Sequence, residues 1–196
     1  ATEQHNVKLV VSLPRLYTRY TQTLQQLVRE GALGTLTSVH VRHTHDGSLP
    51  TPDRPNGRLP QHFYDPVTAQ GGALIDLGCH PIYLNRLFLG MPISLSATFG
   101  YVNARAVEDN AVVTLKYPGG VIGVAETTLT NLYTFSIGLH GTNGSARFSE
   151  PENTLWLRTR TENEWKVHEM PAADPASAFQ QWITHIEQGT EIPYQQ

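Results

Sequence analysis

The chain has 196 residues, of which 39% are apolar and 16% are charged. This composition supports a packed core, so extended disorder is excluded, and the length favours a single domain. A formal net charge of −3 argues against a general nucleic-acid binder, and a single cysteine excludes an internal disulfide. No apolar stretch reaches the ~20 residues of a membrane span. We therefore expect a cytoplasmic protein without a nucleic-acid or membrane partner.

The first half of the chain is predicted to hold two helices and one strand. Residues 7–11 are apolar except for Lys8 and follow a short polar stretch, as when a helix feeds a buried strand, so we expect the chain to be cut from a longer one. Helical spacing over 19–30 and alternation over 35–44 predict a helix and a strand. A proline-rich loop at 48–66, of a length typical of functional lids, separates them from a second helix over 71–89.

The second half changes to a period of two, which indicates strands followed by a last helix over 176–188. Hairpin turns are predicted at 118–120 and 141–144. The expected fold is α+β, with a large open, mostly antiparallel (mixed) sheet and helices on one face. We expect the other face to be an apolar patch available for oligomerisation. The expected strands are 94–100, 111–117, 121–129, 135–140, 145–148, 155–157 and 165–167.

The stretch around Asp76 and His80 carries the strongest chemical signal. In a helix these two residues stand four apart on one face, and Pro81 is expected to kink the helix just after His80. A carboxylate beside an imidazole fixes its tautomer and raises its pKa, which suits a general acid or base. The alternative is a surface pair that contributes a few tenths of a kcal/mol.

The motifs of this chain resemble the C-terminal domain of the glucose–fructose oxidoreductase/inositol dehydrogenase/MocA family. They follow in family order from about Val7 to Pro193. The resemblance implies that His80 is the acid/base acting on a substrate hydroxyl or carbonyl, and that Asp76 orients the substrate or the histidine. It further implies hydride transfer between a sugar, inositol or similar polyhydroxy substrate and NAD or NADP. The matching segments are 28–34, the D-x-G-x-H segment at 71–80, 90–92, 108–111, 119–123 and 141–145.

Two family motifs are missing from the chain. It has no G-x-G-x-x-G fingerprint, and none of its three lysines (Lys8, Lys116 and Lys166) lies in the family's Glu-Lys-Pro context. We therefore expect residues 1–196 to be a single substrate-binding and oligomerisation domain whose N-terminal Rossmann domain is absent. The resemblance implies a homodimer or tetramer through the sheet face. The chain alone should bind no cofactor and be inactive. The alternative is a non-catalytic binding or scaffold domain that lacks a cofactor half.

Further residues are weaker candidates for contacting the substrate. Arg15 lies where the family often has an arginine, although a structural ion pair would explain it equally well. His45 lies at the end of the strand and leads into the proline-rich loop, although a plain surface turn would explain it equally well. Tyr83 lies one turn beyond His80, and a core position is its alternative role. Of the histidines near His45, His43 shares its strand face while His40 points the other way, so we expect no metal site.

Overall fold

The structure, a computed structural model, describes residues 2–5 and 7–192; Pro193, where the resemblance ends, lies outside them. The strands are β1 (Leu36–Thr44), β2 (Ser94–Gly100), β3 (Asn110–Lys116), β4 (Ile122–Thr128), β5 (Phe135–Gly141), β6 (Gly144–Ser149), β7 (Thr154–Thr159) and β8 (Lys166–His168). They form one sheet in the order β2-β3-β4-β1-β5-β6-β7-β8. Only β1 and β4 pair in parallel. The seven strands expected after residue 90 are confirmed, with ends shifted by at most two residues.

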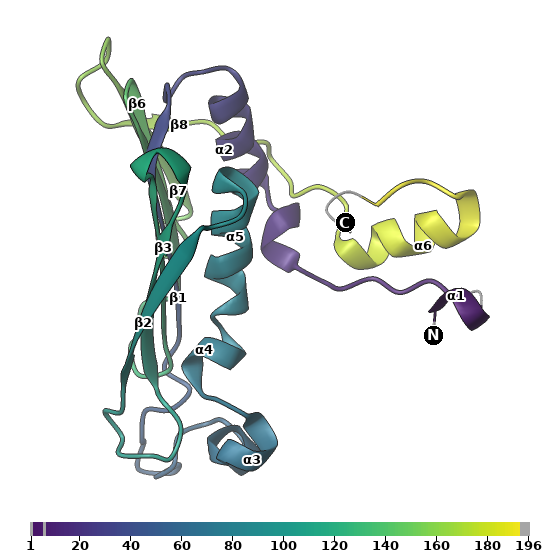
Figure 1. Ribbon diagram of the computed structural model, residues 1–196, viewed down its shortest axis with the longest axis vertical. Coiled ribbons are helices and arrows are strands. Elements are labelled where there is room, and N and C mark those ends of the chain that lie inside the picture. Colours follow the sequence, from purple (N-terminus) through teal and green to yellow (C-terminus); the bar gives the residue numbers. More distant parts are fainter. Residues whose placement is uncertain (1, 6, 193–196) are drawn as a thin grey trace.

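The helices that pack on the sheet all lie on one of its faces (Figure 1). They are α2 (Arg19–Arg29), α4 (Ala73–Asp76) and α5 (Cys79–Leu89). The short α1 (Thr2–His5) and the C-terminal α6 (Ala178–Gln188) stand away from the sheet, and α3 (Pro66–Ala69) lies beyond α4. This layering confirms the expected α+β class. No helix within residues 2–5 and 7–192 has the length and apolar character needed to cross a bilayer.

The main core lies between the helices and the central strands. Val39 and Val41 of β1 pack in one cluster with Leu139 of β5, Leu24 of α2 and Leu84 of α5. Alternate residues of β1, β5 and β6 supply this core, as the period of two predicts. The helix-covered face is therefore the apolar one.

The open face of the sheet is more polar than expected. Because Val39 and Val41 face the helices, their neighbours Ser38, His40 and Arg42 face the open side. The His40 ring meets the His140 ring of β5 edge-on, and Arg42 pairs with Glu126 of β4 at 2.8 Å. The expectation of an apolar patch is wrong for these central strands, since short period-two runs do not reveal which polar residues share a face across strands. Exposed apolar side chains on this face include Val112 and Ile122, at 40% and 39% exposed.

The segment 7–11 is not the buried strand expected from its composition. It has no strand pairing, and Val7 and Leu9 are 55% and 73% exposed. The segment runs away from the sheet toward α1 (Figure 1), and the backbone carbonyl of Lys8 accepts a hydrogen bond from Trp182 Nε1 on α6. Apolar composition predicts burial only where a covering surface exists, and nothing in the described part of the chain covers these side chains.

The single helix expected over 71–89 is instead two helices, α4 and α5, separated at Leu77 and Gly78. In an unbroken helix the residue at position 81 would donate its N–H to the Leu77 carbonyl, but Pro81 has no N–H and its ring would clash there. The chain ends α4 and restarts at Cys79, which places Pro81 in the first turn of α5, where a missing N–H costs nothing. The expected kink after His80 is therefore a break before it.

Glu108, between β2 and β3, fixes the start of α4. Its carboxylate is buried and accepts hydrogen bonds from the backbone N–H groups of Gly72 and Leu74, each at 3.0 Å, while its own carbonyl accepts one from Ala73. A Cβ at position 72 would lie 1.8 Å from the Glu108 carbonyl oxygen, so only glycine allows this approach. These bonds satisfy N–H groups at the start of α4.

Replacing Glu108 by alanine should lower the free energy of unfolding by about 1–3 kcal/mol, because buried N–H groups lose their acceptor. Urea unfolding followed by circular dichroism measures the loss. Glu126→Ala is the matched control, since its half-exposed pair with Arg42 should contribute about 0–1 kcal/mol. Equal losses in both variants would contradict the capping role.

Candidate active site

A cluster of cationic and aromatic side chains lies where the end of β1 meets α5 and η1 (Pro14–Tyr17). Arg15 of η1 is at its centre. Its guanidinium contacts His43 Nε2 of β1 at 3.1 Å, pairs with Glu150 at 3.0 Å, and lies 3.8 Å from the centre of the Phe135 ring. The ion pair expected as the structural alternative for Arg15 is therefore present, and Arg15 also lies next to the candidate histidines.

His80 is held by Tyr83 at the start of α5. His80 Nδ1 lies 2.9 Å from Tyr83 Oη, and the same oxygen accepts a hydrogen bond from the Arg15 backbone N–H at 3.2 Å. Burial lowers the pKa of His80, the positive charge of Arg15 lowers it further, and the charge of Asp76 opposes both. Burial also raises the pKa of Tyr83, which keeps its hydroxyl protonated. The geometry thus supplies a neutral imidazole with one nitrogen anchored.

His43 is the second histidine of this cluster. Its ring meets the His80 ring edge-on, with ring centres 4.5 Å apart. Burial lowers the pKa of His43 to about 3, helped by the charges of Arg15, His80 and His45. Since Nε2 accepts from the Arg15 guanidinium, the neutral ring carries its hydrogen on Nδ1, which is buried without a hydrogen-bond partner in the described structure.

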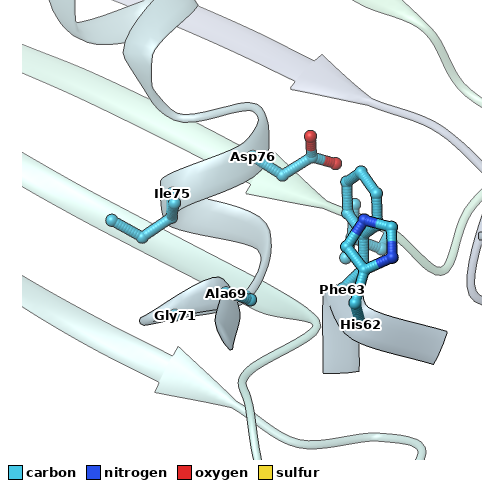
Figure 2. A pocket seen from close by; sticks show the side chains of 8 residues that line it. His62, Phe63, Ala69, Gly71, Ile75 and Asp76 are labelled. Atoms are coloured by element: carbon cyan, nitrogen blue, oxygen red, sulfur yellow. The ribbon is translucent and has the colours of Figure 1, made fainter. Parts of the chain in front are cut away.

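Asp76 lies beside a cavity of about 330 Å³. Figure 2 shows its carboxylate on the same side of α4 as His62 and Phe63, which come from η2 (Gln61–Tyr64), while Ile75 extends from the other side. Apart from Asp76 and His62 the lining side chains are apolar or absent, and no lysine or arginine lines the cavity. A small pocket with few polar groups is typical of small-molecule sites. The complete lining is His62, Phe63, Ala69, Gly71, Gly72, Ile75, Asp76 and Leu129.

The candidate residues fall into two adjoining groups. Arg15, His80 and Tyr83 form one group, while Asp76 faces His45, whose Nε2 lies 3.6 Å from the Asp76 carboxylate. The direct contact between Asp76 and His80 that one unbroken helix would give is not formed, because the break before Pro81 turns the two side chains apart. Asp76 influences His80 through its charge alone.

Four residues around the site were not among the sequence candidates: His43, His62, Phe63 and Glu150. The sequence held a signal for His43, which shares its strand face with Val39 and Val41 and so points under the helices. Glu150 reaches Arg15 from the end of β6, and neither it nor the η2 residues have a local pattern that marks them.

The histidines do not converge on a metal. His40 lies on the open face against His140, whereas His43 and His45 have separate partners. Among residues 2–5 and 7–192 no three histidine, cysteine, aspartate or glutamate side chains are arranged to hold an ion.

Comparison with known proteins decides the family. Residues 21–147 match the sequence profile of the GFO/IDH/MocA C-terminal domain. The chain belongs to the GFO/IDH/MocA family. Its relatives include trans-1,2-dihydrobenzene-1,2-diol dehydrogenase of Sus scrofa, 29% identical over 112 residues, which are 56% of this chain and 32% of that protein.

A second relative of this GFO/IDH/MocA chain is dTDP-3,4-didehydro-2,6-dideoxy-alpha-D-glucose 3-reductase of Streptomyces antibioticus. It is 30% identical over 160 residues, 78% of this chain and 43% of the relative. The structure of a levoglucosan dehydrogenase with NADH and levoglucosan shares the fold, with a TM-score of 0.79 and 18% identity over 98% of this chain and 60% of that one. The chain spans about a third to two fifths of the length of these two curated relatives, both oxidoreductases by name.

The low pKa of His43 makes the stability of the fold depend on pH. In the unfolded chain His43 has its ordinary pKa of 6.5 and is protonated below that pH, whereas in the folded chain it is protonated only near pH 3. The free energy of unfolding should therefore fall as the pH drops through this window. His43→Gln should lose less stability than the wild type between about pH 7 and pH 4 in urea unfolding. His62→Gln, on the exposed η2, is the control and should keep the wild-type dependence; an unchanged profile in His43→Gln would refute the assignment.

Proposed function

We propose that this chain is the C-terminal substrate-binding and acid/base domain of an NAD(P)-dependent oxidoreductase that acts on a sugar, inositol or similar polyhydroxy compound. The observation that carries the proposal is His80, a neutral imidazole anchored at Nδ1 by Tyr83 and close enough to Asp76 to feel its charge, while the Asp76 carboxylate lines a cavity. The family relationship and the dehydrogenase and reductase names of the relatives support it.

The lining of the cavity supports this substrate class. The Asp76 carboxylate can accept hydrogen bonds from hydroxyl groups, and the apolar wall from Phe63 to Leu129 suits the C–H surfaces of a ring. Without a lysine or arginine in the lining, a phosphate or carboxylate group would find no counter-charge there. An uncharged polyhydroxy ring therefore fits better than a sugar phosphate.

The proton transfer is proposed to run through His80. In the tautomer that we propose for the reaction, His80 Nδ1–H donates to Tyr83 Oη, so that the neutral ring has a lone pair on Nε2 that takes the proton of the substrate hydroxyl as the carbinol carbon is oxidised. The Arg15 backbone N–H holds Tyr83 in place. In the reducing direction the imidazolium returns the proton to the carbonyl oxygen.

The hydride acceptor is proposed to lie outside this chain. A bound nicotinamide ring would accept the hydride, but the chain has no G-x-G-x-x-G turn to hold its pyrophosphate. A covering domain has a surface to pack on: the exposed Leu9 lines an apolar groove with Phe179 and Trp182 of α6. We propose that the dinucleotide domain of the full-length protein covers this groove.

Replacing His80 by alanine in the full-length protein should lower kcat by roughly 10²–10⁴-fold, because the proton then has no acceptor of suitable pKa. Turnover is measured with myo-inositol, glucose and levoglucosan and with NAD and NADP. His168→Ala, on β8 at the far edge of the sheet, is the control and should keep wild-type turnover. Wild-type turnover in His80→Ala would refute the catalytic role, and a wild type inactive on every substrate would favour the scaffold alternative.

We also propose that the open sheet face forms a homodimer or tetramer. Val112 and Ile122 place exposed apolar surface on this face, and the stacked His40 and His140 lie on the same side. Light scattering should give a mass of at least two chains, and the double variant Val112→Glu with Ile122→Glu should shift it toward one. Val67→Glu, on α3, is the control that should leave the mass unchanged. A monomeric wild type would contradict the proposal.

A further inference from the structure

His45 has its ring orientation and tautomer fixed by its own loop. The backbone N–H of Gly47 donates a hydrogen bond to His45 Nδ1 at 2.9 Å. Because Nδ1 accepts, the hydrogen of the neutral ring must lie on Nε2. A Cβ at position 47 would be 2.6 Å from His45 Cε1, so glycine is what allows the ring to fold back over the turn.

The nitrogen that carries this hydrogen faces Asp76. His45 Nε2 lies 3.6 Å from Asp76 Oδ2, an ion-pair distance that is longer than a hydrogen bond. This carboxylate oxygen is buried and has no hydrogen-bond partner in the described structure. An unsatisfied buried oxygen is costly, so a donor directed at it has a clear energetic role.

Asp76 needs such an anchor because of its place in the chain. It is the last residue of α4, which has only four residues, and the break at Leu77 and Gly78 follows at once. One helical turn gives little rigidity to its final side chain. Asp76 lines the cavity together with His62, and His45 reaches Asp76 from the end of β1.

We propose that His45 is a positioning residue that holds the Asp76 carboxylate in one rotamer facing the cavity. The imidazole Nε2–H attracts Oδ2 electrostatically across the 3.6 Å between them, and the other oxygen is left to receive a substrate hydroxyl. This role rests on the proposed function for its consequence in turnover, but the orientation of Asp76 can be measured without any substrate.

Two variants of His45 separate the two ends of its ring. Glutamine places its amide N–H near the position of Nε2 and so keeps the donor to Asp76. Asparagine places an oxygen near the position of Nδ1, which keeps the acceptor for Gly47 and loses the donor to Asp76. A purely structural role for the turn predicts that asparagine is the better replacement, whereas the positioning role predicts glutamine.

The test is nuclear magnetic resonance on the labelled chain at about pH 8. Long-range ¹H–¹⁵N spectra should show His45 protonated on Nε2. Three-bond couplings to Asp76 Cγ, which report its χ1 rotamer, should indicate a single rotamer in the wild type and in His45→Gln, and averaging in His45→Asn. An Nδ1–H tautomer, averaged couplings in the wild type, or a single rotamer in His45→Asn would each overturn the proposal.

Kinetics of the full-length protein supply the second readout. With the best substrate among myo-inositol, glucose and levoglucosan, His45→Asn should lower kcat/KM about 10–100-fold, mainly by raising KM, because a misplaced carboxylate weakens substrate orientation. His45→Gln should stay within a few-fold of the wild type. An inactive wild type would count against the proposed function alone, since the rotamer of Asp76 is decided by the couplings.

Discussion

Pro81 is the constraint on which the arrangement of the site depends. A proline inside a helix removes a backbone hydrogen bond, and here the chain ends one helix and begins another just before it. The break directs Asp76 toward the cavity and His45, while His80 lies in the first turn of α5, where its Nδ1 is 2.9 Å from Tyr83 Oη. One backbone restriction thus places the two residues of a simple i, i+4 pair in two different chemical environments.

Arg15 sets the electrostatics of the second environment. Its charge is balanced by Glu150 on one side, and its guanidinium packs on the Phe135 ring. On the other side the same charge lowers the pKa of both His43 and His80, adding to the effect of burial. The structural ion pair and the tuning of the histidines are therefore two consequences of one side chain.

Local patterns predicted most of the fold. The turns at 118–120 and 141–144, with glycines at fixed places, located two hairpins, and the strands on either side of them follow from alternation. The break before Pro81 could also have been deduced from the sequence, because proline is acceptable only in the first turn of a helix. The polar character of the open face could not be deduced from the sequence, since it depends on which strands become neighbours in the sheet.

The sequence could predict only those parts of the site that lie within one local motif. Asp76 and His80 lie within one short motif, whereas Glu150 meets Arg15, and His45 meets Asp76, only through the tertiary fold. Whether an apolar stretch such as 7–11 is buried depends on whether another surface covers it. Composition shows that a segment is able to be buried, and the remainder of the structure decides whether it is.

The central position of β1 links formation of the site to the order in which the sheet folds. Ser38 pairs with Ile122 on β4 and with His140 on β5, so both neighbours of β1 come from far along the chain, and closing such long loops slows folding. The strands β2–β3–β4 and β5–β6–β7 each pair with their neighbours in sequence and need no such closure. His43 lies on the strand that joins these two halves, and His45 follows directly after it. A chain in which only the hairpins have formed therefore has not yet brought these histidines to Arg15 and Asp76, and the candidate site is assembled only when the long-range pairing of β1 is complete.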